Sequence, residues 1–185
     1  MRGTFVTING TSHLVQGEGG VFLQTQTLDD LLQTYPEFAF PVVIKIDTDG
    51  FETAVLRGAK GLLATARPVV FYEWHPDYYR SAGEDDVNHA DLLMDLGYEG
   101  FIFFTNIGEP LLSIRNPSHP VLESLARFSR GRRQLDDWHY DIAAFPVERS
   151  IVWERFSRHC SNPDLPLDLS FAVVGCIAQS LLLPC

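Results

Sequence analysis

Apolar side chains occur along residues 21–115 in two kinds of run, short β-branched segments and longer stretches with helical spacing. The segments 42–46 (Val-Val-Ile-Lys-Ile) and 69–72 (Val-Val-Phe-Tyr) are almost continuously apolar, which is typical of strands covered on both faces. Between them the apolar positions follow one face of a helix, at residues 51, 54, 55, 59, 62, 63 and 66. We therefore expect 42–46 to be a central strand, parallel to 69–72 and joined to it by a right-handed helical crossover.

The pattern up to residue 115 continues this alternation of strands and helices. A short strand is predicted at 21–25, a helix capped by Thr27 follows it, and a helix at 87–96 stops at Gly97. A strand at 98–105, a turn, and a returning strand at 111–115 complete the series. The order predicts an α/β fold with a mostly parallel sheet and a C-terminal antiparallel hairpin.

Residues 116–185 are less regular, because prolines interrupt them. They predict one short helix at 122–128. The apolar segment 171–183 has no clear period, and its 13 residues fall short of the roughly 20 that a membrane-spanning helix requires. It fits a buried strand, a partner surface or an unrelated tail. We divide the chain into an N-terminal remnant (1–20), one domain (21–150) and a C-terminal tail of uncertain structure (151–185).

Composition and charge narrow the class of partner. The 24 acidic residues outnumber the 14 basic ones, and the net charge of −10 disfavours binding to nucleic acid. The N-terminus lacks the apolar run of a signal peptide. The cysteines Cys160, Cys176 and Cys185 have neither zinc-site nor disulfide-framework spacing. These features predict a cytoplasmic protein without a membrane span or a metal, whose partner is a small molecule.

Candidate catalytic residues follow the predicted strand at 42–46. In open α/β sheets ligands bind beyond the carboxyl ends of the strands, where this chain has Asp47, Asp49 and Glu52. Asp47 or Asp49 can accept a proton or a hydrogen bond from a substrate hydroxyl, or bind a hard cation. The alternative is structural, since an aspartate before a helix is a common N-cap and Glu52 suits the first turn.

The next strand also ends in ionisable residues, Glu73 and His75. The His75 imidazole is a second candidate base, although a single histidine is more often an ordinary polar residue. Lys45 interrupts an otherwise apolar strand. It either extends to the edge of the sheet or pairs with a buried carboxylate.

Several of these segments together resemble the FkbM family of S-adenosylmethionine-dependent methyltransferases. That family has a TLDD-like helix start, a KIDVEGxE-like segment, a VLxGA helix and a P-x-x-x-x-E strand. Asp49 here stands where the family usually has Glu. A late YxDxLAF-P-like segment matches residues 138–146. The matching segments are Gln26-Thr27-Leu28-Asp29-Asp30, Val43-Ile44-Lys45-Ile46-Asp47-Thr48-Asp49-Gly50-Phe51-Glu52, Val55-Leu56-Arg57-Gly58-Ala59 and Pro68-Val69-Val70-Phe71-Tyr72-Glu73.

The resemblance implies that the chain forms the later strands of a Rossmann-like class I methyltransferase sheet. It also implies that the protein methylates a hydroxyl group of a small molecule or glycan. Asp47 and His75 would then be catalytic, and Asp49, Glu52 and Glu73 would bind the substrate. The glycine-rich DxGAxxG-like loop that holds the cofactor in the family is not found in this sequence. We therefore assign no cofactor-binding residue and expect S-adenosylmethionine to bind weakly.

Two other classes of function remain open at this stage. The chain is either a truncated, inactive form or a non-catalytic interaction domain that pairs, with another chain or a second copy, through an exposed edge at 42–46. A metal-dependent hydrolase using Asp47, Asp49 and His75 ranks last, because it does not account for the order of the motifs.

Overall fold

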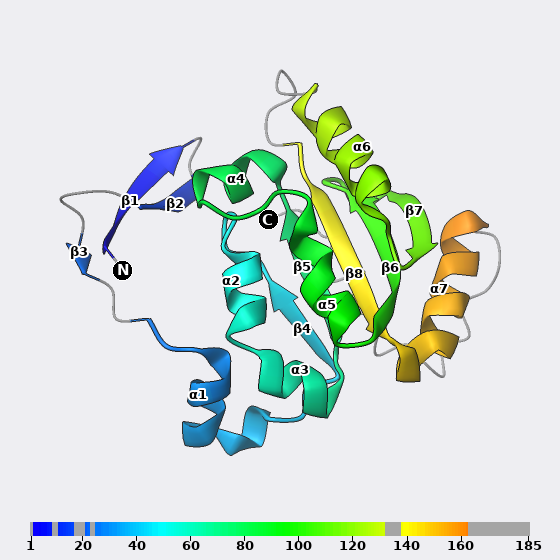
Figure 1. Ribbon diagram of the computed structural model, residues 1–185, viewed down its shortest axis with the longest axis horizontal. Coiled ribbons are helices and arrows are strands. Elements are labelled where there is room, and N and C mark those ends of the chain that lie inside the picture. Colours follow the sequence, from blue (N-terminus) through cyan, green and yellow to red (C-terminus); the bar gives the residue numbers. More distant parts are fainter. Residues whose placement is uncertain (1, 9–10, 17–20, 23–24, 132–137, 163–185) are drawn as a thin grey trace.

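The computed structural model describes residues 2–8, 11–16, 21–22, 25–131 and 138–162 (Figure 1). A five-stranded sheet lies at its centre, in the order β4-β5-β8-β6-β7. Its strands are β4 (Val43–Ile46), β5 (Val69–Trp74), β6 (Tyr98–Thr105), β7 (Pro110–Arg115) and β8 (Tyr140–Pro146).

The predicted parallel pair and the predicted hairpin are both confirmed. β4 pairs with β5 in parallel, Val43 beside Val69 and Ile46 beside Tyr72, and β6 pairs with β7 antiparallel. The expectation of a mostly parallel sheet is only partly met, because β8 inserts between β5 and β6 and runs antiparallel to both. β4, β5 and β6 therefore share one direction, while three of the four pairings in this sheet are antiparallel.

The prediction that residues 42–46 form a central strand is wrong for the described part of the chain. β4 is an edge strand there, with β5 as its only strand neighbour. A continuous apolar run indicates that both faces of a strand are covered, but it does not indicate whether both edges of the strand are paired with other strands.

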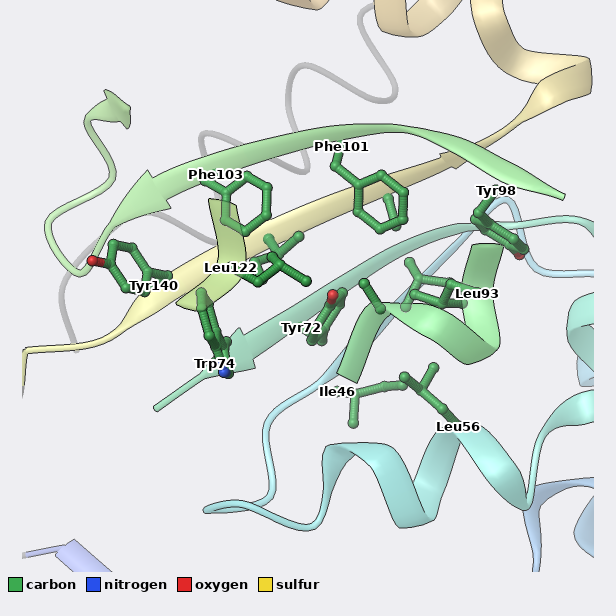
Figure 2. Packing of buried hydrophobic residues seen from close by; sticks show 14 of the residues in the cluster. Ile46, Leu56, Tyr72, Trp74, Leu93, Tyr98, Phe101, Phe103, Leu122 and Tyr140 are labelled. Atoms are coloured by element: carbon green, nitrogen blue, oxygen red, sulfur yellow. The ribbon is translucent and has the colours of Figure 1, made fainter. Parts of the chain in front are cut away.

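Helices cover one face of the sheet and enclose the larger part of the core. α2 (Glu52–Arg57), α3 (Lys60–Ala66) and α5 (Asp91–Asp95) pack there, and α5 follows the short helix η2 (Asn88–Ala90). Figure 2 shows large buried side chains from the sheet and from these helices packed together, among them Ile46, Leu56, Tyr72, Trp74, Leu93, Phe101, Phe103 and Tyr140. The β-branched runs and the helical face between them predict that seven of their residues are mostly buried. Four of these are buried (Ile46, Leu62, Val70 and Phe71) and three are half-buried (Val43, Ile44 and Val55).

The single helix expected across residues 51–66 is two helices, α2 and α3, separated at Gly58 and Ala59. The cause is a contact with α1 (Leu28–Thr34). The Asp29 carboxylate accepts the backbone N–H groups of Gly61 (2.7 Å) and Leu62 (2.9 Å), and so caps the start of α3. The Gly58 carbonyl accepts the Asp29 N–H at 2.9 Å, while a Cβ at Gly58 would lie only 3.3 Å from the Thr27 Cβ. The predicted Thr27 cap of α1 is confirmed, since Thr27 Oγ1 accepts the Asp30 N–H.

The helix after β8 and the apolar cluster beneath it occupy the other face. α7 (Ser150–Ser161) follows the turn η3 (Val147–Arg149) and packs on β6, β7 and β8. Its Trp153 ring lies over Gly100, where a Cβ would approach Trp153 Cδ1 to 2.5 Å. Residues 150–161, predicted mostly as part of an irregular tail, are therefore an ordered helix, while residues 163–185 lie outside the described residues.

Three short strands near the N-terminus form a separate antiparallel sheet. They are β1 (Arg2–Ile8), β2 (Thr11–Gln16) and β3 (Val21–Phe22), in the order β2-β1-β3. The strand predicted at 21–25 is thus present in part, but it joins this small sheet and not the central one. The remaining elements are η1 (Pro36–Phe38), α4 (Pro76–Ser81) and α6 (His119–Arg130), the last of which contains the predicted 122–128 helix. No helix of the described residues is long and apolar enough to cross a membrane.

Candidate functional site

The polar cluster predicted at the strand ends lies where three neighbouring strands meet. β4 and β5 end at this side of the sheet, and β8, which runs the opposite way, begins there. Glu73 stands directly opposite Asp141 in the β5–β8 pair. Because side chains alternate along a strand, Lys45, Glu73 and Asp141 share the face of the sheet on which α7 packs further along.

Asp47 is the most accessible carboxylate of this group that sequence reasoning selected. Its side chain is 46% exposed, and Oδ2 lies 3.0 Å from Lys45 Nζ. Burial lowers the pKa of Lys45, but the hydrogen bond to Asp47 and the charges of Asp47, Asp141 and Glu73 together leave this pKa raised. Lys45 is therefore a cation beside Asp47. It lies on the edge strand of the sheet, as the first alternative predicted, and the carboxylate that it pairs with is exposed and not buried.

The loop after β4 is held in place from within by Glu52. This side chain is only 1% exposed, and its carboxylate accepts the Thr48 N–H (2.7 Å), the Thr48 hydroxyl (3.1 Å) and the Gly50 N–H (3.0 Å). Burial raises the pKa of Glu52, although these hydrogen bonds act in the opposite direction. Glu52 thus fixes the loop that presents Asp47, and its described contacts are made inside the protein.

A left-handed turn brings the same loop against α4. Asp49 and Gly50 have φ angles of 53° and 97°, and a Cβ at Gly50 would lie 2.4 Å from the Tyr78 carbonyl oxygen. Only glycine fits this close approach of two backbones. The N-cap position of α2 belongs to Phe51, which makes no side-chain cap hydrogen bond. The helix-capping interpretation of Asp47 and Asp49 therefore gains no support from the observed start of α2.

His75 lies directly after β5 and begins α4. Its Nδ1 accepts the Tyr78 N–H at 3.4 Å, and its ring stacks on Tyr78 with centroids 3.8 Å apart. The imidazole is thus oriented by α4, at the same end of the sheet as Asp47 and Glu73. Sequence reasoning placed His75 at this strand end, but it did not identify the helix that the histidine caps.

Two residues of the cluster were not selected from the sequence, His139 and Asp141. His139 Nε2 lies 3.8 Å from Glu73 Oε2, and its ring is 6.5 Å from that of His75. The pKa of Asp141 is raised, chiefly by burial. The charges of His139 and Lys45 act to lower this pKa, and the charge of Asp47 acts to raise it. The signal was available in residues 138–142, where Trp, Tyr and Ile alternate with His and Asp as in a strand.

Behind the site, the core contains a second set of polar groups that no solvent reaches. His89 is fully buried, its Nδ1 is 2.9 Å from the Tyr72 hydroxyl, and its ring lies 4.3 Å from that of Trp74. Burial lowers the pKa of His89 to about 3, so the imidazole is neutral in the folded protein. Tyr79, also buried, donates its hydroxyl to the Glu73 carbonyl at 3.2 Å.

The arrangement joins five ionisable side chains from three strands around one sheet end: Lys45, Asp47, Glu73, His139 and Asp141. Carboxylates and imidazoles at such a position can accept a proton from a substrate hydroxyl. Within the described ranges, no group of three His, Cys, Asp or Glu side chains has the geometry to hold a metal ion.

Comparison with known proteins identifies the family of this chain. The family model described as the methyltransferase FkbM domain matches residues 6–101, which is more than half of the 185-residue chain. The match includes β4, the Asp47–Gly50 loop, α2, α3 and β5. No curated protein and no solved structure matches the chain. The chain belongs to the FkbM methyltransferase family.

Proposed function

We propose that this protein transfers a methyl group from S-adenosylmethionine to a hydroxyl oxygen of a small molecule or a glycan, at the sheet end formed by β4, β5 and β8. The observation that supports this proposal is the convergence of Asp47, Glu73 and Asp141 at one sheet end in a chain of a methyltransferase family. The donor supplies a methyl group on a positively charged sulfur. Carboxylates suit a cationic ligand, so the described residues fit such a donor electrostatically.

In the proposed reaction the acceptor oxygen forms the new bond to the methyl carbon while the carbon–sulfur bond breaks. The sulfur keeps the electron pair of that bond, and the hydroxyl proton leaves to a base. Asp47 is our first choice for this base, because its carboxylate is exposed at the end of β4. His75 is the second choice, since α4 orients its ring at the same end of the sheet.

The other candidate residues have supporting roles in this proposal. Glu73 and Asp49 are proposed to accept hydrogen bonds from the hydroxyl groups of the acceptor. Glu52 acts indirectly, because its carboxylate holds Thr48 and Gly50 and so sets the position of Asp47. Much of the rate acceleration in a methyl transfer arises from aligning acceptor and donor, so a fixed loop contributes to the rate directly.

A methyl-transfer assay with isotopically labelled S-adenosylmethionine tests the proposal. Methyl glycosides serve as glycan probes and simple alcohols as small-molecule probes, with the donor at millimolar concentration. Asp47→Asn keeps the size of the side chain and removes its charge, so it should lower kcat by about 10²–10⁴ if Asp47 is the base. Asp95→Asn, on the exposed end of α5, is the matched control and should leave kcat unchanged. Full turnover by Asp47→Asn together with loss of turnover in His75→Ala would exchange the two roles, and no effect of either would refute this site.

A further inference from the structure

Lys45 interrupts the apolar run of β4, and the proposed function gives it no role. It lies beside Phe71 in the β4–β5 register. Val43, two residues earlier on the same face of the strand, packs against the apolar cluster beneath α7. A β-branched side chain would suit position 45 better than lysine, because β-branched residues are enriched in strands and lysine is depleted. Packing therefore does not account for this lysine.

The stability of the folded chain does not account for it either. The ion pair joins Lys45 Nζ to Asp47 Oδ2 at 3.0 Å, and the two side chains are 39% and 46% exposed. Ion pairs with this exposure are screened by solvent and contribute little to the free energy of unfolding. A lysine that suits its strand poorly and gains little stability from its partner indicates a role in the site.

Three carboxylates from three strands meet near the Lys45 ammonium group. Asp47 follows β4, and Glu73 of β5 stands directly opposite Asp141 of β8. Carboxylates placed directly opposite each other on neighbouring strands repel. Burial lowers the pKa of Lys45, while the charges of these three carboxylates each raise it, so all three lie within electrostatic range of the ammonium group. Lys45 is thus a cation shared by the carboxylates of the candidate site.

We propose that Lys45 is a positioning residue, whose ammonium group fixes the direction of the Asp47 carboxylate and offsets its repulsion by the carboxylates of β5 and β8. The loop after β4 is held at its backbone, because Glu52 accepts the N–H groups of Thr48 and Gly50. Lys45 adds a contact at the Asp47 side chain. Its part in catalysis rests on the proposed function, in which a base must be aligned with the acceptor hydroxyl. The sharing of its charge does not.

Competitive acetylation tests the shared charge without any methyl transfer. The chain contains two lysines, Lys45 and the exposed Lys60 on α3, so Lys60 is an internal reference in every sample. N-hydroxysuccinimidyl acetate at mildly alkaline pH reacts with the neutral amine, and peptide mass spectrometry gives the rate at each lysine. Loss of a neighbouring negative charge lowers the pKa of Lys45 and frees more amine. Asp47→Asn and Asp141→Asn should therefore raise the rate at Lys45 relative to Lys60 by about three- to tenfold. Asp95→Asn on α5 is the matched control and should leave the ratio unchanged.

The two acidic variants distinguish a shared cation from an isolated ion pair. A rise in Asp47→Asn alone would mean that Lys45 pairs with one carboxylate only, and would overturn the shared charge. No rise in Asp47→Asn, or the same rise in Asp95→Asn, would overturn the proposal as a whole. Far-UV circular dichroism shows which variants are folded. Glu73→Gln takes the place of Asp141→Asn if that variant does not fold, because Glu73 also acts on Lys45.

Steady-state kinetics test the part of Lys45 in catalysis. Lys45→Met keeps the length of the side chain and removes its charge, so it should lower kcat about 10- to 100-fold with little change in the KM of the acceptor. Lys45→Arg keeps the charge and should retain more of kcat than Lys45→Met. In an Asp47→Asn background Lys45→Met should cause no further loss, because both changes act through one carboxylate.

The outcomes separate this proposal from the proposed function. Equal losses of kcat from Lys45→Met in the native and Asp47→Asn backgrounds would show that Lys45 does not act through Asp47. An unchanged or raised kcat in Lys45→Met would also refute the positioning role. If the native protein methylates none of the probes, the proposed function fails, and the acetylation ratio still decides whether Lys45 holds these carboxylates.

Discussion

Acid sensitivity of folding should arise in large part from the buried imidazole of His89. This side chain is fully buried, and burial lowers its pKa to about 3, whereas an unfolded histidine titrates near ~6.5. Above pH 6.5 the imidazole is neutral in both states and has no effect on the pH dependence. Below about pH 6.5 the unfolded chain binds a proton that the folded protein rejects, so the free energy of unfolding falls as the pH falls toward 3.

The magnitude follows from the two pKa values. At pH 5 the unfolded histidine is almost fully protonated and the folded one is neutral, which corresponds to a loss of about 2 kcal/mol relative to pH 7.5. Glu52 and Asp141 act in the opposite direction, because their raised pKa values favour proton binding by the folded state. A direct pH profile of the native protein would therefore mix opposing effects. Substitution of His89 alone separates them.

Urea unfolding of the native protein and of His89→Phe at pH 7.5 and pH 5 provides this test. Phenylalanine keeps an aromatic ring against Trp74 but leaves the buried Tyr72 hydroxyl without its imidazole partner, which should cost about 1–3 kcal/mol at pH 7.5. Between the two pH values the native protein should lose about 2 kcal/mol more than the variant. His119→Gln, at an exposed histidine on α6, is the control for the loss of a histidine outside the core. An identical pH dependence in native protein and His89→Phe would refute the reasoning.

Three further outcomes are expected. Gly50→Ala should destabilise the protein clearly more than Gly83→Ala in thermal unfolding. Both glycines have positive φ angles, but only at Gly50 would a Cβ collide with a backbone atom, the Tyr78 carbonyl oxygen at 2.4 Å. Equal losses of stability would show that the Tyr78 contact is unimportant. Asp29→Ala should cost about 0.5–2 kcal/mol in urea unfolding through loss of the α3 cap, and a loss no greater than that of the exposed Asp95→Ala would contradict the capping role. Calorimetry should show that the 185-residue chain binds S-adenosylmethionine more weakly than micromolar, since its sequence has no glycine-rich cofactor loop; a Kd at or below micromolar, about 8 kcal/mol, would refute that expectation.

Much of the local structure could be predicted from the sequence, because it depends on neighbours along the chain. The β-branched runs at β4 and β5, the Thr27 cap and the left-handed Gly97 after α5 all follow from side-chain sterics or local hydrogen bonds. Two strands joined by a helical crossover run parallel, so their carboxyl ends lie at the same side of the sheet. For this reason Asp47 and Glu73, which stand at two such ends, were expected near each other.

Tertiary structure decided the features that depend on contacts distant in sequence. The segment 140–146 is mostly apolar, as in a buried strand, but only the assembled sheet places it between β5 and β6 and brings His139 and Asp141 to the site. The break between α2 and α3 requires the Asp29 carboxylate from α1, which the helical period of residues 51–66 does not contain. The edge position of β4 and the complete burial of His89 likewise depend on which elements pack beside them. Hydrophobic periodicity reports how many faces of an element are covered, and it does not report which element covers them.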